Sequence, residues 1–268
     1  MTRRDKVCHI KHVIPYLVRN VLGTPISAIP LAKIDCIVSS LIEKIGKKTF
    51  FYVNAHCLNI AAIDSQYKRI LQQASLVYSG GLGPVIASRI LGQGLPERTP
   101  TPDFIDKVFA TAQKKGWSIY LLGTHTHSLE KTVAKLRDTF PKLAIVGYHH
   151  GFFTKEEEGQ VVEDINLKQP RILIVGMGTP RQEKFIAENI YRINAQTFWA
   201  VGALFDVISE ELPRAPLWIQ SIGLEWLFRL FQEPKRLWRR YIIGNTVFVL
   251  RVISSLMPSR YRFTVRWQ

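Results

Sequence analysis

Short apolar runs alternate with segments of helical periodicity from the N-terminal part of the chain to residue 205. The runs expected to form strands are residues 50–53, 76–78, 118–122, 143–147, 171–176 and 197–202. Between them, apolar residues recur three or four positions apart, as in Leu129, Val133 and Leu136, which is typical of amphipathic helices. This alternation predicts an α/β fold, with a mainly parallel sheet and helices on both faces.

The pattern changes after residue 212 to helices without strands. Apolar segments at 217–222, 224–231 and 237–252 are separated by Gly223 and Pro234. We therefore expect a core over residues 1–212 and a helical appendage over residues 213–268. The first 45 residues are only loosely patterned and give no assignment.

The charge distribution predicts a binding partner. The chain has a net charge of +15, and residues 213–268 hold ten Lys or Arg against two acids, together with four of the six Trp. Arg, Trp and Leu mixed on helices are typical of a segment that lies on an anionic membrane, and this Trp-rich placement argues against nucleic acid. The apolar stretch 241–257 contains Arg251 and is shorter than the roughly 20 residues of a spanning helix.

The N-terminal residues and the cysteines indicate the compartment. No secretory signal is recognisable at the N-terminus, and Cys8, Cys36 and Cys57 are odd in number and in no paired spacing. We therefore expect a reducing cytoplasm, with the protein peripheral on the inner face of the cell membrane.

Three turns with glycine follow predicted strands and open predicted helices, at residues 78–84, 123–128 and 176–183. Glycine lets the backbone approach a ligand, and the free N–H groups of a helix N-terminus favour phosphate oxygens. None of the turns has the full G-x-G-x-x-G spacing, which argues against a dinucleotide-dependent oxidoreductase. In the third turn, Thr179, Pro180 and Gln182 predict a helix capping box. A ligand role for Gln182 is the alternative, and the two roles are compatible.

Metal and cofactor signals are weak. The pairs His125/His127 and His149/His150 have no Cys, Asp or Glu cluster at ligand spacing, and the chain has no Asp-x-Asp sequence. We expect no metal site and no cofactor. The charge of a diphosphate would then be met by arginine and by helix N-termini.

Several stretches together resemble the WecG/TagA/CpsF family of glycosyltransferases. They are residues 95–98 (LPER), 176–184 (GMGTPRQEK), 214–216 (RAP), 223–230 (GLEWLFRL) and 232–241 (QEPKRLWRRY). The resemblance runs from about residue 48 to 245. It implies a Rossmann-like core and an inverting, metal-independent transfer from a UDP-sugar, of the N-acetylmannosamine type or a related hexose, to a polyprenyl-diphosphate-linked sugar. The implied setting is cell-surface or exopolysaccharide synthesis at a membrane. The oligomeric state stays open, a homo-oligomer included.

The resemblance also implies substrate-binding residues. Matched by motif, they are Asn54, Gly81, Gly83, Arg98, Gly178, Gln182, Arg229, Arg236 and Arg239. Arg98 would bind a diphosphate, and the three appendage arginines would reach the diphosphate of the donor or of the lipid. The alternative for those three is a solvated stripe that faces the membrane. Asp103 matches an Asp of the family, with helix N-capping as its alternative role.

Two positions depart from the family pattern. The first glycine-rich loop of the family usually begins with an Asp, the proposed base, and the residue here is Gly80. A positioned base contributes about 10²–10⁴-fold, so another group has to serve: His56, Asp103 or a phosphate oxygen of the substrate. The family's Thr two residues before Asn54 is Tyr52, which would re-line a sugar pocket. The alternative function is that of a catalytically degenerate relative that binds a glycolipid or a partner enzyme.

Overall fold

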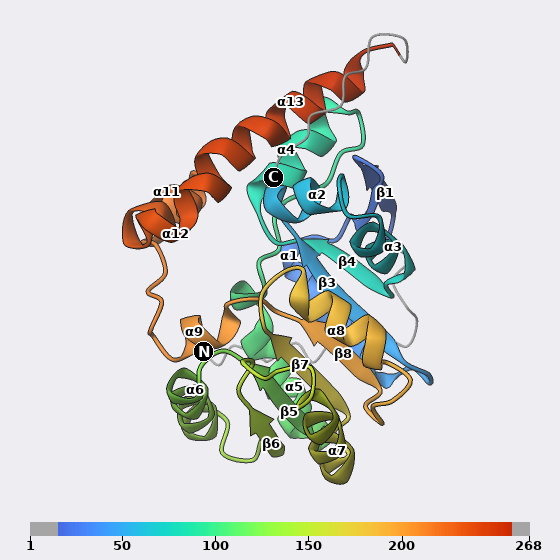
Figure 1. Ribbon diagram of the computed structural model, residues 1–268, viewed down its shortest axis with the longest axis vertical. Coiled ribbons are helices and arrows are strands. Elements are labelled where there is room, and N and C mark those ends of the chain that lie inside the picture. Colours follow the sequence, from blue (N-terminus) through green and yellow to red (C-terminus); the bar gives the residue numbers. More distant parts are fainter. Residues whose placement is uncertain (1–15, 259–268) are drawn as a thin grey trace, which may run out of the picture.

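The structure is a computed structural model that describes residues 16–258. Cys8 lies outside this range, as do four of the basic and Trp residues counted in residues 213–268, namely Arg260, Arg262, Arg266 and Trp267. Within it, a six-stranded parallel sheet has the strand order β4-β3-β8-β7-β5-β6 (Figure 1). The strands are β3 (Lys48–Val53), β4 (Leu76–Ser79), β5 (Ile119–Gly123), β6 (Ile145–His149), β7 (Ile172–Gly176) and β8 (Thr197–Ala200).

The predicted strands are confirmed, with one shift. The strand expected at residues 143–147 begins two residues later, because Leu143 is used in a turn. Its N–H bonds the carbonyl of Phe140 at 3.0 Å, just after the preceding helix, and the ladder with β5 starts at Ile145.

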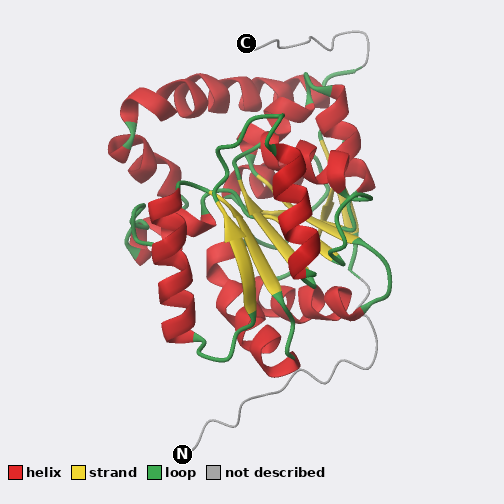
Figure 2. Ribbon diagram, turned by 60° about the horizontal axis from the view of Figure 1, so that its bottom comes forward, coloured by secondary structure: helices red, strands yellow, loops and turns green. Residues whose placement is uncertain are grey.

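Helices cover both faces of the sheet, as the alternation of apolar runs predicts (Figure 2). Neighbouring residues of one strand point to opposite sides, so that Phe51 and Phe50 belong to different apolar clusters. Phe51 shares its cluster with α2 (Ala55–Ala61), α3 (Ser65–Gln73), α4 (Leu82–Ile90), α7 (Glu158–Lys168) and α8 (Arg181–Asn189). Phe50 shares the other with α1 (Leu31–Glu43), α5 (Ile105–Lys115), α6 (Thr126–Thr139) and α9 (Leu204–Ile208).

The N-terminal part of the described chain has a structure that the sequence pattern did not indicate. Strands β1 (Val18–Val21) and β2 (Thr24–Ser27) form an antiparallel hairpin before α1. Leu22 and Gly23 connect them with φ values of 53° and 82°, a turn that suits the twist of a hairpin. The strands have four residues each, too short for a visible period.

The appendage forms helices α10 (Leu217–Ser221), α11 (Glu225–Gln232), α12 (Pro234–Trp238), a π-helical turn η2 (Arg239–Ile243) and α13 (Gly244–Leu256). Pro234 is the first residue of α12, a position where proline needs no N–H partner, and the chain continues helically to α13. Helix α13 packs on α2 (Figure 1). None of the helices in residues 16–258 combines the length and apolarity needed to cross a bilayer.

Candidate active site

Four neighbouring strands, β4, β3, β8 and β7, end at one edge of the sheet. Ligands of parallel α/β sheets bind at such carboxyl edges. The backbone joins the loops there, because Gly80 N–H donates to Val53 O and Val201 N–H donates to Val175 O, both at 2.9 Å. The first and third glycine-containing turns of the sequence therefore both lie at this edge.

Asn54 and the first glycine turn fix the start of two helices. Asn54 Oδ1 accepts a hydrogen bond from Cys57 N–H at 3.1 Å and caps α2. A Cβ added at Gly81 would lie 3.4 Å from the Asn54 Cβ, and one at Gly83 would lie 3.1 Å from the Ala55 Cβ. These glycines let the N-terminus of α4 approach α2 closely. Their contact with substrate stays a prediction.

The third turn does not form the predicted capping box. Helix α8 begins after Pro180, and Thr179 donates its hydroxyl hydrogen to Glu183 Oε1 at 2.9 Å instead of capping the backbone. Gln182 is fully buried; its side-chain oxygen accepts from Gly202 N–H at 3.0 Å and its nitrogen donates to Glu183 at 2.9 Å. Gly178, with φ of 78°, makes the turn possible. The capping prediction is wrong because these side chains point into the protein.

Glu183 is a buried carboxyl that sequence reasoning missed. Its exposed fraction is 0%. Burial raises the pKa of Glu183 to about 7, although hydrogen bonds from Gln182 and Thr179 favour the ionised form. A Glu in the first turn of a helix has an ordinary stabilising role, so its sequence position carries no signal. The structure nevertheless places a titratable group directly behind the edge of the sheet.

Tyr52 lies on strand β3, between β4 and β8, and two glycines flank its ring. A Cβ added at Gly80, after β4, would lie 2.8 Å from Tyr52 Cδ2. A Cβ added at Gly202, after β8, would overlap the Tyr52 hydroxyl. Since both glycines follow the strands next to β3, the phenol extends toward the carboxyl edge. Burial raises the pKa of Tyr52 above its usual value.

The two candidate bases named from the sequence lie in different surroundings. Burial, followed by the charge of Arg240, lowers the pKa of His56 to about 4. Asp103 lies in the short helix η1 (Thr101–Asp103) and forms an ion pair with Arg214 at 2.6 Å. N-capping by Asp103 is wrong, because α5 begins after Phe104 without a side-chain cap. A catalytic role stays a prediction for both.

Arg98 connects the core to the appendage. Its guanidinium donates to Glu225 Oε2 at 3.1 Å and to Gln220 O at 3.2 Å. Arg214 lies 3.7 Å from the same Glu225 carboxylate and also bonds Gln220 Oε1 at 2.7 Å. The predicted diphosphate-binding arginine is thus held at the junction of the two parts, and its contact with a diphosphate stays a prediction.

The appendage arginines are distributed over separate elements. Arg229 lies on α11, whereas Arg236 on α12 pairs with Glu233, and Arg239 begins η2 with its guanidinium 5.4 Å from the Trp238 ring centre. The three therefore do not share one helix. The charge that reaches His56 and Tyr52 is that of Arg240 in η2, which is not among the residues matched by motif.

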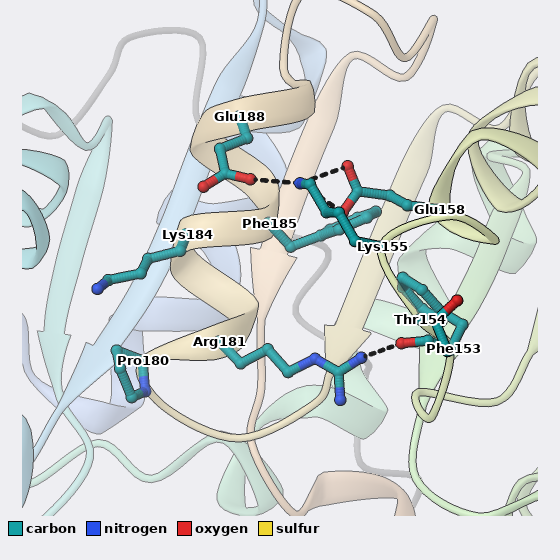
Figure 3. Close-up of a pocket in the computed structure, with 9 residues that line it drawn as sticks. All are labelled: Phe153, Thr154, Lys155, Glu158, Pro180, Arg181, Lys184, Phe185 and Glu188. Carbon is teal, nitrogen blue, oxygen red and sulfur yellow. Dashed lines mark hydrogen bonds and ion pairs between the residues drawn. The ribbon is translucent and has the colours of Figure 1, made fainter.

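A hollow of about 460 Å³ lies on the outer side of α8 (Figure 3). Lys155 lies between Glu158 and Glu188 there, and Arg181 donates to Phe153 O at 2.8 Å. These charges are already paired with protein groups. Gln182 and Glu183 face the opposite way, into the protein, so the hollow is separate from the carboxyl-edge cluster.

Comparison with known proteins identifies similar chains. The model of the "Glycosyl transferase WecG/TagA/CpsF family" matches residues 19–262. A Bacillus subtilis protein is 29% identical over 232 residues, which cover 86% of each chain. A Staphylococcus aureus protein is 30% identical over 186 residues, covering 69% of this chain and 72% of that one. Both are named N-acetylglucosaminyldiphosphoundecaprenol N-acetyl-beta-D-mannosaminyltransferase.

Proposed function

This chain belongs to the WecG/TagA/CpsF glycosyltransferase family, and from that premise we propose that it transfers a hexose from a UDP-sugar to a polyprenyl-diphosphate-linked sugar. The observation that carries the proposal is the match over residues 19–262, together with relatives named for a diphosphoundecaprenol acceptor. The reaction is an inverting, metal-independent transfer at the cytoplasmic face of the membrane. The carboxyl edge, with Arg240 beside it, suits a diphosphate leaving group.

Purified protein is expected to release UDP only when a UDP-sugar and a polyprenyl-diphosphate N-acetylglucosamine are both present. Coupled UDP detection measures the rate, and mass spectrometry of the lipid identifies the transferred sugar. A panel of donors with N-acetylmannosamine, other N-acetylhexosamines and hexoses defines the preference. Added chelator should leave the rate unchanged. The Bacillus subtilis relative serves as the control under identical conditions.

A second function is supported by the absence of a carboxylate at Gly80, where Tyr52 lies over the glycine. A scaffold of this kind could hold a glycolipid or a partner enzyme without chemistry. Lack of turnover with every donor, while the control relative turns over, would favour this function. Glycolipid binding without turnover would then be its direct signature.

We also propose that the appendage docks on a membrane, and its exposed side chains support this. Leu217, Trp218 and Phe231 are 67–81% exposed, although such side chains are more often buried. Further large apolar side chains on α12, η2 and α13 are also exposed, namely Trp238, Ile242, Ile243, Val249, Leu250, Ile253 and Leu256. Apolar side chains next to arginines suit the interface of an anionic bilayer.

Replacing Leu217, Trp218 and Phe231 together with Ser is expected to weaken binding to phosphatidylglycerol-containing vesicles at least about tenfold. Each large apolar side chain buried in the interface contributes about 1.5–3 kcal/mol. Vesicle co-sedimentation measures the change. The matched control replaces Leu167 and Tyr191, which are 76% and 90% exposed on the core, and should bind like the unmodified protein. Equal sedimentation of the triple variant would exclude docking through these residues.

A further inference from the structure

A row of hydroxyl and carboxyl groups leads from Tyr52 into the protein. The Tyr52 hydroxyl lies against Gly202, whose N–H donates to Gln182 Oε1 at 3.0 Å, and Thr179, which follows β7, acts on the same hydroxyl. The Thr179 hydroxyl donates to Glu183 Oε1 at 2.9 Å, and its oxygen lone pairs can take up a proton. Tyr52 is partly exposed and Glu183 is fully buried. The row therefore joins the carboxyl edge of the sheet to a carboxyl group that solvent does not reach.

Glu183 is held in one orientation at the inner end of this row. Oε1 accepts from both Thr179 and Gln182, each at 2.9 Å. Among the described residues, the buried Oε2 has no hydrogen-bond partner. Burying a carboxyl group with one oxygen unpaired destabilises the folded state, so such a group is a candidate for a functional role.

The titratable groups around Glu183 come from several elements. Tyr52 faces it from β3, Cys57 from α2 and Tyr67 from α3. Arg240 of η2 acts on Tyr52 and Cys57. The tyrosines and the thiol are uncharged at neutral pH. Within this set, the charges that act on the Tyr52 phenol are therefore the negative charge of ionised Glu183 and the positive charge of Arg240.

We propose that Tyr52 takes the proton of the acceptor sugar hydroxyl and passes its own proton through Thr179 to Glu183, a role that rests on the proposed transferase function. As the acceptor oxygen forms its bond to the anomeric carbon of the donor, its proton moves to Tyr52 Oη. The Tyr52 proton moves to Thr179 Oγ1, and the Thr179 proton moves to Glu183 Oε1. The bond from the anomeric carbon to the diphosphate breaks, and UDP leaves with the electron pair.

The neighbouring acids and bases suit this task less well. The carboxylates of Asp103 and Glu225 already bind Arg214 and Arg98, at 2.6 Å and 3.1 Å. His56 has a pKa of about 4, well below neutrality. Glu183, with a pKa of about 7, is matched to the working pH. The bare Cα atoms of Gly80 and Gly202 give the Tyr52 phenol its room.

The test compares steady-state transfer by the full-length protein and by conservative variants. Tyr52→Phe, which removes one oxygen, is expected to lower kcat by about 10²–10⁴-fold with little change in KM. Thr179→Val should do the same, whereas Thr179→Ser keeps a hydroxyl and retains most activity. The matched control is Tyr120→Phe. Tyr120 also packs over a glycine, Gly147, and donates to the Asp164 carboxylate at 2.6 Å. It lies on β5, which two strands separate from β3.

The pH profile separates proton transfer from a purely structural role. With Glu183 as the acceptor, kcat of the unmodified protein should fall about tenfold from pH 8 to pH 6, because protonation of Glu183 closes the route. Glu183→Gln should have a low kcat that no longer rises through pH 7. An unchanged profile in that variant, or full activity of Tyr52→Phe, would overturn the proposal; loss in His56→Gln alone would make the histidine the acceptor. No turnover by the unmodified protein would instead overturn the transferase function itself.

Discussion

Gly80→Asp alone is expected to destabilise the protein by about 1–3 kcal/mol and to lower transfer, whereas the same change combined with Tyr52→Thr should be tolerated. The reason is steric: a Cβ at residue 80 would lie 2.8 Å from Tyr52 Cδ2 and 3.2 Å from Tyr52 Cβ. Overfilling a packed site costs this much because neighbouring side chains leave their preferred rotamers. Urea unfolding of the single and double variants measures the free energy of unfolding.

The double variant also carries a functional expectation. Asp at residue 80 would supply a carboxylate with an ordinary pKa of roughly 4, so transfer should persist to lower pH than in the unmodified protein. Gly202 provides the control, because Gly202→Asp meets the same ring but has φ of 62°, a strain that Tyr52→Thr does not remove. Additive effects of Gly80→Asp and Tyr52→Thr, within about 0.5 kcal/mol, would contradict the steric coupling.

The sequence predicts the scaffold of this site better than its chemistry. Apolar runs place the strands, and glycine turns place the loops, because both depend on local backbone preferences. The departures at Gly80 and Tyr52 are also visible in sequence, but as two separate changes. Their coupling depends on the phenol extending along the strand toward residue 80, a side-chain direction that a period of two does not specify.

The other differences have the same physical origin. Thr179 and Gln182 have the residue types and spacing of a capping box, yet both side chains bond Glu183. A pattern records which residue can cap, whereas tertiary packing decides where its hydrogen bonds go. Arg240, in the π-helical turn η2, is the arginine whose charge acts on His56, whereas the motif match indicates the residue before it, Arg239.

Arg251 is the charge whose role changes most between sequence and structure. In sequence it interrupts an apolar stretch and indicates a helix that lies on a membrane. In the structure it is 9% exposed and donates to Asn59 O at 2.9 Å and to Asn59 Oδ1 at 2.7 Å. Asn59 Nδ2 in turn donates to Gly244 O at 2.6 Å. The arginine therefore fastens α13 to α2 from the inner side of the helix.

Asn59→Ala is accordingly expected to lower the free energy of unfolding by about 2–4 kcal/mol. The variant removes one hydrogen bond from a buried guanidinium and one from the Gly244 carbonyl, and hydrogen bonds to charged groups contribute about 1.5–3 kcal/mol each. Arg251→Met is the matched comparison; it removes the charge together with its need for partners and should cost less. Chemical unfolding measures both variants, and equal losses would contradict the buried-charge explanation.

The Asn59→Ala variant also tests whether the contact between α13 and α2 positions Arg240 in the candidate active site. Helix α13 continues from η2, so a loosened α13 allows Arg240 to move away from His56. Because burial and the positive charge of Arg240 both depress the pKa of His56, that pKa should rise from about 4 toward its ordinary value in Asn59→Ala. NMR titration of the imidazole measures the rise. An unchanged His56 pKa in a destabilised but folded Asn59→Ala protein would mean that η2 is held in place independently of α13.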